Sequence, residues 1–118
     1  MTVTGVLYSN NQAVEISIED GNIHKIKLLQ QQDDPDLLLI SPGFIDLQVN
    51  GYAGISFTDE GLTVEDIYKV TAGLWKEGVT TYLPTIITAP KDVTLKNLEI
   101  LGESLKDESI RNSVPGFF

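Results

Sequence analysis

Residues 41–54 read SPGFIDLQVNGYAG, in which an apolar run follows a Pro-Gly break and ends in polar residues and glycines. This stretch predicts a strand over Phe44–Val49 that is buried on both faces, as in parallel sheets covered by helices. Side chains alternate along a strand, so Asp46, Gln48 and Asn50 share one face. The fold class that this indicates is α/β.

Ligands of parallel sheets and barrels bind at the carboxyl ends of the strands. Asp46, Gln48 and Asn50 stand at such an end, so we predict that they contact substrate or water there. A second interpretation stays open, in which Asp46 binds N–H groups of the loop and Asn50-Gly51 is simply a turn.

A helix and a second strand are predicted downstream. Thr63 is a candidate N-cap with Asp66 three residues on, and Gly78 stands where a helix ends. Trp75 is expected to pack against the sheet. The β-branched and aromatic stretch VTTYLPTIIT, residues 79–88, predicts a strand with Pro84 near its end. The residues expected in the core of the helix are Ile67, Val70, Thr71 and Leu74.

The same pattern then repeats. Pro90 and Asp92 open a second helix, and VPGFF, residues 114–118, predicts the start of a third strand. Strands that alternate with helices indicate βαβ units. The side chains expected towards the core of the second helix are Leu95, Leu98, Leu101 and Leu105.

A β-hairpin is predicted near the start of the chain. The stretch AVEISIED, residues 13–20, alternates cleanly between apolar and polar residues, and IHKIKLL, residues 23–29, is its return strand. Gly21 and Asn22 are expected to take positive φ in the turn between them. Gln30–Asp36 reads as a polar loop.

Composition limits the partners. The net charge of −9 argues against nucleic acid and against an anionic membrane surface. The absence of cysteine excludes disulfides and thiolate metal sites. No signal peptide and no run long enough to span a membrane is visible, so we expect a cytoplasmic protein. His24, the one histidine, is expected on the surface, because a metal site would need further ligands.

The motif PGFIDLQVNG, residues 42–51, resembles the first barrel strand of N-acetylglucosamine-6-phosphate deacetylases in the amidohydrolase superfamily. EDGNIHKI, residues 19–26, looks like their small β-domain, and GVTTYLPTIIT, residues 78–88, is similar to their second barrel strand. Most amidohydrolases end the first strand in His-x-His, whereas this subgroup often has Gln-x-Asn, as Gln48 and Asn50 do here.

The resemblance implies a small β-sandwich segment, residues 1–41, and the first two βα units of a truncated (β/α)8 TIM barrel, residues 42–118. It implies hydrolysis of N-acetylglucosamine 6-phosphate, a phosphorylated amino sugar, to glucosamine 6-phosphate and acetate. A divalent metal ion such as zinc or iron would assist. Gln48 and Asn50 occupy the positions of the first-strand histidine pair, as metal-site or water-binding residues. Family members are commonly dimers, so a homodimer is also open.

A barrel of this kind needs about 250 residues, and the chain has 118. In the family, the stretch similar to VPGF continues into His-x-Glu-Gly-Pro with a metal-binding glutamate, whereas here Phe118 stands at the position of that histidine. We therefore expect an N-terminal fragment, from a truncated gene or a deliberate shortening. It would hold no catalytic residue, bind metal weakly and be inactive alone.

Two alternatives stay open. One is another amidohydrolase, acting on a cyclic amide or a different acylated amine, because Pro-Gly-Phe-Ile-Asp is widespread in the superfamily. The other is a non-catalytic module that binds a complementary fragment or oligomerises through exposed strand edges.

Overall fold

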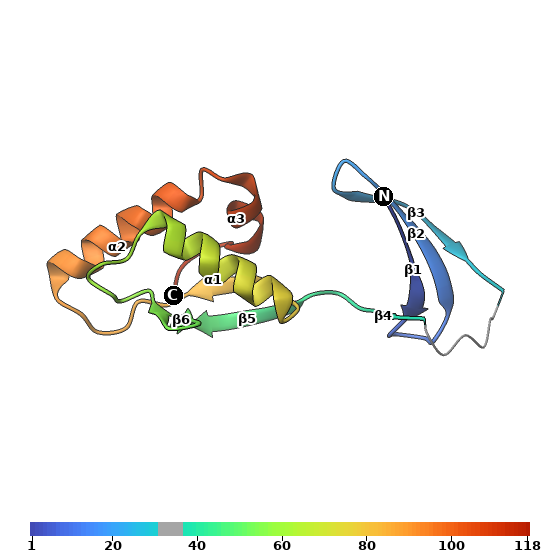
Figure 1. Cartoon of the computed structure of the whole chain (residues 1–118), viewed down its shortest axis with the longest axis horizontal. Helices are drawn as coiled ribbons and strands as arrows, with labels where there is room; N and C mark the ends of the chain where they lie inside the picture. The colour runs from blue at the N-terminus through green and yellow to red at the C-terminus, as the bar shows by residue number, and fades with distance from the viewer. Residues whose placement is uncertain (31–36) are drawn as a thin grey trace. The chain divides into compact units, whose positions relative to one another are not determined.

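The computed structural model describes residues 1–30 and 37–118. The chain divides into two compact units, Met1–Pro42 and Gly43–Phe118 (Figure 1). The polar loop predicted at Gln30–Asp36 lies outside the described residues except for its first residue. In the part of the chain that is described, no helix is both long enough and apolar enough to cross a membrane.

The first unit is a four-stranded sheet in the order β3-β2-β1-β4. β1 pairs antiparallel with β2 and parallel with β4, and β2 pairs antiparallel with β3. The predicted hairpin is therefore confirmed. The strands are β1 (Thr2–Leu7), β2 (Ala13–Glu19), β3 (Asn22–Leu28) and β4 (Leu39–Ile40).

The turn between β2 and β3 differs from the prediction in one residue. Glu19 pairs with Asn22, so the turn has only two residues. Positive φ falls on Asp20 (49°) and Gly21 (75°), and Asn22 already belongs to the strand. Two successive left-handed residues match the twist of the flanking strands, which explains the shift. The Asn22 side chain donates to the Asp20 carbonyl at 3.0 Å.

The second unit is built around the parallel pair β5–β8. Its order of strand, helix, strand, helix confirms the predicted α/β pattern, whereas the hairpin β6–β7 and the helix α3 were not predicted. Figure 1 shows the three helices on one side of the β5 ribbon. The elements are β5 (Phe44–Val49), β6 (Gly51–Tyr52), β7 (Ile55–Ser56), α1 (Val64–Lys76), β8 (Val79–Pro84), α2 (Lys91–Ser104) and α3 (Glu108–Ser113).

Both ends of α1 follow the sequence signals. The Thr63 hydroxyl accepts from the Asp66 N–H at 3.2 Å, and the Asp66 carboxylate accepts from the Thr63 N–H at 3.1 Å. This is the reciprocal capping box. Gly78 has φ +82°, as a residue that ends a helix requires. Trp75, which the sequence predicts to pack against the sheet, is 41% exposed and donates its indole N–H to Ser113 in α3.

The core of this unit lies between α1 and β8. Tyr82 is completely buried, and its ring stacks on Phe57 with the centroids 6.2 Å apart. Its hydroxyl lies 2.8 Å from the Thr71 hydroxyl, which donates to the Ile67 carbonyl at 2.7 Å. Because the one hydroxyl proton of Thr71 goes to the Ile67 carbonyl, the Tyr82 hydroxyl is the donor to Thr71. Burial raises the pKa of Tyr82. All four residues predicted for the α1 core are buried: Ile67, Val70, Thr71 and Leu74.

The predicted core face of α2 was wrong. Leu95 and Leu98 are 52% and 39% exposed, and of the four predicted leucines only Leu101 is fully buried. The helix instead turns inward a face that includes a polar residue, because Asn97 hydrogen-bonds to the loop after β7. The residues that this face buries are Val93, Asn97, Leu101 and Ser104.

The prediction that β5 is buried on both faces was also wrong for this chain. Phe44, Ile45 and Leu47 are 67–68% exposed, and Val49 is the one buried residue of the strand. The α1 helix packs against β8 and β6, and β8 is the one strand neighbour of β5 in residues 1–30 and 37–118. The side chains of β5 before Val49 are therefore left uncovered.

The predicted third strand is present only in its hydrogen bonding. Residues 114–118 form no assigned strand. However, the Phe118 N–H donates to the Pro84 carbonyl at 2.9 Å, and the Phe118 carbonyl accepts from the Ile86 N–H at 3.3 Å. In parallel strands, the N–H and the carbonyl of one residue bond to two residues of the neighbouring strand that are two positions apart, as Phe118 does with Pro84 and Ile86. The sheet therefore continues past β8.

Candidate functional site

The carboxyl ends of β5 and β8 lie side by side. Val49 pairs with Pro84, and the Thr85 N–H donates to the Val49 carbonyl at 2.8 Å. Asn50 and Thr85 are thus the first residues beyond the two strand ends. This is the edge at which parallel sheets bind ligands. Gln48 and Asn50 lie next to this edge, whereas Asp46 pairs with Tyr82 in the middle of the two strands.

Asp46 is partly engaged with the backbone. Its carboxylate accepts a hydrogen bond from the Gln48 N–H at 3.0 Å. The second interpretation expected Asp46 to bind N–H groups of the loop, whereas its partner Gln48 lies within β5. Asp46 and Gln48 are both exposed, so their remaining hydrogen-bonding groups face solvent.

Asn50 begins a small hairpin that caps this edge. Its carbonyl accepts from the Phe57 N–H at 3.0 Å, which closes β6–β7 behind it. A Cβ atom at Gly51 would collide with the Ile55 carbonyl oxygen, so a glycine is required directly after Asn50. The turn of the hairpin takes positive φ at Ala53 (52°) and Gly54 (83°). The Asn50 side chain is exposed.

The loop after β7 is tied to the segment after β8. The Asp59 carboxylate accepts from the Ser56 N–H at 2.9 Å, which gives Asp59 a structural role in the turn. The Thr58 hydroxyl accepts from the Ile87 N–H at 3.2 Å. The two loops that follow the paired strands therefore form one connected rim.

Two residues of α2 fix this rim, and sequence reasoning missed both. Lys96 donates its ammonium group to the Glu60 carbonyl at 2.9 Å. Asn97 is completely buried, and its amide N–H groups donate to the Phe57 and Asp59 carbonyls at 2.9 and 3.0 Å. The available signal was an amide in the middle of a helix, four residues from Val93 and from Leu101, where an apolar stripe would be expected.

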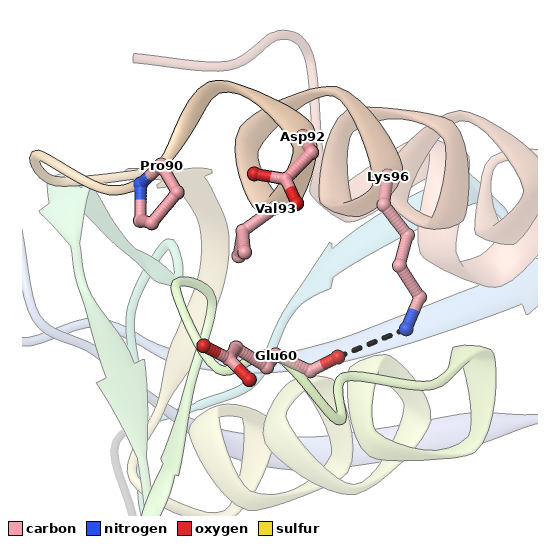
Figure 2. Close-up of a pocket in the computed structure, with 5 residues that line it drawn as sticks. All are labelled: Glu60, Pro90, Asp92, Val93 and Lys96. Carbon is pink, nitrogen blue, oxygen red and sulfur yellow. Dashed lines mark hydrogen bonds between the residues drawn. The ribbon is translucent and has the colours of Figure 1, made fainter.

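A shallow pocket lies beside this contact (Figure 2). It is lined by Glu60, Pro90, Asp92, Val93 and Lys96. Figure 2 shows the Glu60 carboxylate turned away from Lys96, whose amine instead meets the Glu60 backbone carbonyl. The charged groups of the pocket are the carboxylates of Glu60 and Asp92 and the ammonium group of Lys96, which is already hydrogen-bonded to the Glu60 carbonyl. This set does not indicate a particular class of ligand.

The donors present do not fit a metal ion. Among the described residues, no group of three or more His, Cys, Asp or Glu side chains could hold one. Gln48 and Asn50 offer neutral amides, which are weak ligands beside imidazole or carboxylate. His24 is exposed on β3, 3.6 Å from the Glu19 carboxylate, as expected of a surface histidine. A metal at the mouth of β5 would need ligands from other polypeptide.

The chain is similar in sequence to part of the deacetylases of two phosphorylated amino sugars. The chain is 40% identical over 77 residues to the N-acetylglucosamine-6-phosphate deacetylase of Caenorhabditis elegans, a match of 62% of this chain and 18% of that protein. It is 35% identical over 77 residues to the N-acetylgalactosamine-6-phosphate deacetylase of Escherichia coli O157:H7, covering 64% of this chain and 20% of that one. The chain thus spans about a fifth of the length of these relatives. No family model matches.

The fold agrees with the sequence. The crystal structure of the N-acetylglucosamine-6-phosphate deacetylase from Pasteurella multocida superposes with a TM-score of 0.69 at 26% identity. The superposition covers 91% of this chain and 31% of that one. Sequence and fold together relate this chain to one segment of the N-acetylglucosamine-6-phosphate deacetylases.

Proposed function

We propose that this chain is part of a deacetylase that hydrolyses N-acetylglucosamine 6-phosphate to glucosamine 6-phosphate and acetate. The observation that carries the proposal is the 40% identity over 77 residues to a deacetylase of that substrate. The matching fold of a second such enzyme supports it. We propose a cytoplasmic location with it, because a chain without cysteine needs no oxidising compartment.

The architecture proposed for the whole protein is a (β/α)8 barrel with a flanking β-sandwich. Residues 1–41 would belong to the sandwich and residues 42–118 to the first βα units. The parallel β5–β8 pair and the bonding of Phe118 to the far edge of β8 support a sheet that grows by parallel strands.

Gln48, Asn50 and Asp46 are the proposed site residues. Gln48 and Asn50 would donate and accept hydrogen bonds with substrate or water at the mouth of the barrel, because both amides are exposed there. Asp46 would mainly hold the backbone at Gln48. A divalent metal would supply Lewis-acid chemistry to the whole protein, with its strong ligands outside this chain.

The chain alone is expected to be inactive, because it lacks a set of metal ligands among its described residues. The purified chain should release no acetate from N-acetylglucosamine 6-phosphate in the presence of zinc or iron(II). Turnover above the rate of the metal alone would contradict this.

A chimera tests the activity of these residues directly. The matched segment of the C. elegans enzyme is replaced by the corresponding residues of this chain, and kcat/KM for N-acetylglucosamine 6-phosphate is measured. We expect the chimera to stay active and to lose about tenfold or more in kcat/KM with Gln48→Ala or Asn50→Ala, because one substrate hydrogen bond contributes about that much. Asn112→Ala, an exposed amide on α3, is the matched control.

A second candidate substrate is N-acetylgalactosamine 6-phosphate, since one relative is a deacetylase of that sugar. The same chimera separates the two by its ratio of kcat/KM values. The relatives reported above give no support to hydrolysis of a cyclic amide.

A further inference from the structure

The hairpin that follows Asn50 is too short to be stable by itself. β6 and β7 have two residues each, with Tyr52 paired to Ile55. An isolated two-stranded hairpin is marginally stable in water, so contacts with the rest of the unit have to hold it. The position of Asn50 depends on this hairpin, because the Asn50 carbonyl accepts from the Phe57 N–H directly after β7.

The ring of Tyr52 attaches the hairpin to α1. It lies where a side chain of Gly73 would stand, since a Cβ atom placed on Gly73 would come within 2.5 Å of the ring carbon Cε1. A glycine inside a helix is unfavourable relative to alanine, so this close contact gives Gly73 a structural reason. The same point at Gly102, the glycine of α2, has no neighbouring atom within 4 Å.

The hydroxyl of Tyr52 makes a second contact with α1. It donates to the Glu77 carboxylate at 2.9 Å, since a carboxylate can only accept. This hydrogen bond raises the pKa of Tyr52 from its ordinary 10.0, and burial acts in the same direction. Glu77 is the C-cap of α1, two residues before β8 begins. Ring and hydroxyl together therefore fix the hairpin to the end of α1 that leads into β8.

We propose that Tyr52 is a positioning residue of the candidate site, which holds the β6–β7 hairpin through Gly73 and Glu77 and so fixes Asn50 at the carboxyl end of β5. The inference rests on the proposed function for the role of Asn50 toward the substrate. The Tyr52 hydroxyl is engaged by Glu77, so Tyr52 acts through Asn50.

The first test uses the full 118-residue chain and needs no activity. Tyr52→Phe keeps the ring and removes the hydrogen bond to Glu77. Amide hydrogen exchange by NMR at Phe57 should become about threefold faster or more, because the hairpin opens more often. Exchange at Leu101 in the core of α2 should not change, whereas a general loss of stability would speed both. Tyr8→Phe, at a 67% exposed tyrosine of the other unit, is the matched control.

A second pair of variants tests the ring contact. Gly73→Ala places a methyl group against the Tyr52 ring and should also speed exchange at Phe57. Gly102→Ala places the same group in open space on α2 and should leave that rate unchanged. Both changes raise helix propensity, so only the collision with Tyr52 distinguishes them. Unchanged exchange at Phe57 in both Tyr52→Phe and Gly73→Ala overturns the proposal.

The effect on activity is measured in the chimera described above as a double-mutant cycle. Tyr52→Phe should lower kcat/KM about threefold or more in the parent chimera and have little further effect beside Asn50→Ala, because residues that act through one another are not additive. Equal losses in the two backgrounds, or no loss in the parent chimera, overturn the proposal. An inactive parent chimera together with faster exchange at Phe57 supports the positioning of Asn50 and counts against the proposed function.

Discussion

β5 and β8 are neighbouring parallel strands of six residues each, yet their environments differ. Tyr82 in the middle of β8 is completely buried, whereas Leu47 in β5 is 68% exposed. The difference does not come from strand propensity, because both sequences are mostly apolar and both form strands. It comes from where α1 and α3 pack, which is on β8.

The comparison shows that an apolar sequence indicates that a strand is able to be buried. Whether the strand is covered depends on the rest of the polypeptide. In β8 the covering layer is within the chain, and in β5 it is not among the described residues. The following predictions measure that difference, from the largest expected effect to the smallest.

The sharpest measurement replaces one side chain on each strand. Tyr82→Ala should lower the free energy of unfolding by about 3–5 kcal/mol, because it removes a buried ring stacked on Phe57. Leu47→Ala should change it by less than about 0.5 kcal/mol, as at most exposed positions. Urea unfolding followed by circular dichroism gives both values. Similar losses for the two variants would mean that β5 is covered in solution.

The rim held by α2 should respond less strongly. Asn97→Ala removes both amide donors from the Phe57 and Asp59 carbonyls and should cost about 1–3 kcal/mol in the free energy of unfolding. Asn112→Ala, an exposed asparagine on α3, is the control and should be nearly neutral. Equal effects in urea unfolding would show that the buried amide does not hold the loop.

The cap of α1 should contribute a smaller amount. Thr63→Ala removes the hydroxyl that accepts from the Asp66 N–H, and it should lower the free energy of unfolding by about 1 kcal/mol, as other N-cap changes do. Thermal or urea unfolding measures this loss. Thr63→Ser keeps the acceptor and should stay close to the parent chain. A serine variant as unstable as the alanine variant would assign the effect to the lost methyl group.

The smallest effect is the pH dependence of the same cap. The hydrogen bond from the Thr63 side chain, with Lys69 nearby, lowers the pKa of Asp66 from its ordinary 3.8. A depressed carboxyl pKa stabilises the fold above the unfolded value, and that contribution is lost as the pH falls through the folded pKa. NMR titration should show the pKa of Asp66 below 3.8 in the parent chain and closer to 3.8 in Thr63→Ala. Identical values would contradict the assigned cause.

The sequence by itself determined the elements whose signals are local. The capping pair Thr63 and Asp66 placed the start of α1, and Gly78 placed its end, because these residues satisfy or release backbone groups next to them in the chain. The period of two in β2 predicted the hairpin. The motif around Gln48 and Asn50 indicated the deacetylase resemblance, which the relatives then supported.

Only the tertiary structure decided which apolar faces are covered. The leucines of α2 offered one plausible inward face, but the hydrogen bonds of Asn97 to a loop almost 40 residues away selected another. Likewise the apolar pattern of β5 predicted burial, and the packing of the helices on β8 left it exposed. Both choices depend on contacts between residues distant in sequence, which the local periodicity of a helix or strand does not contain.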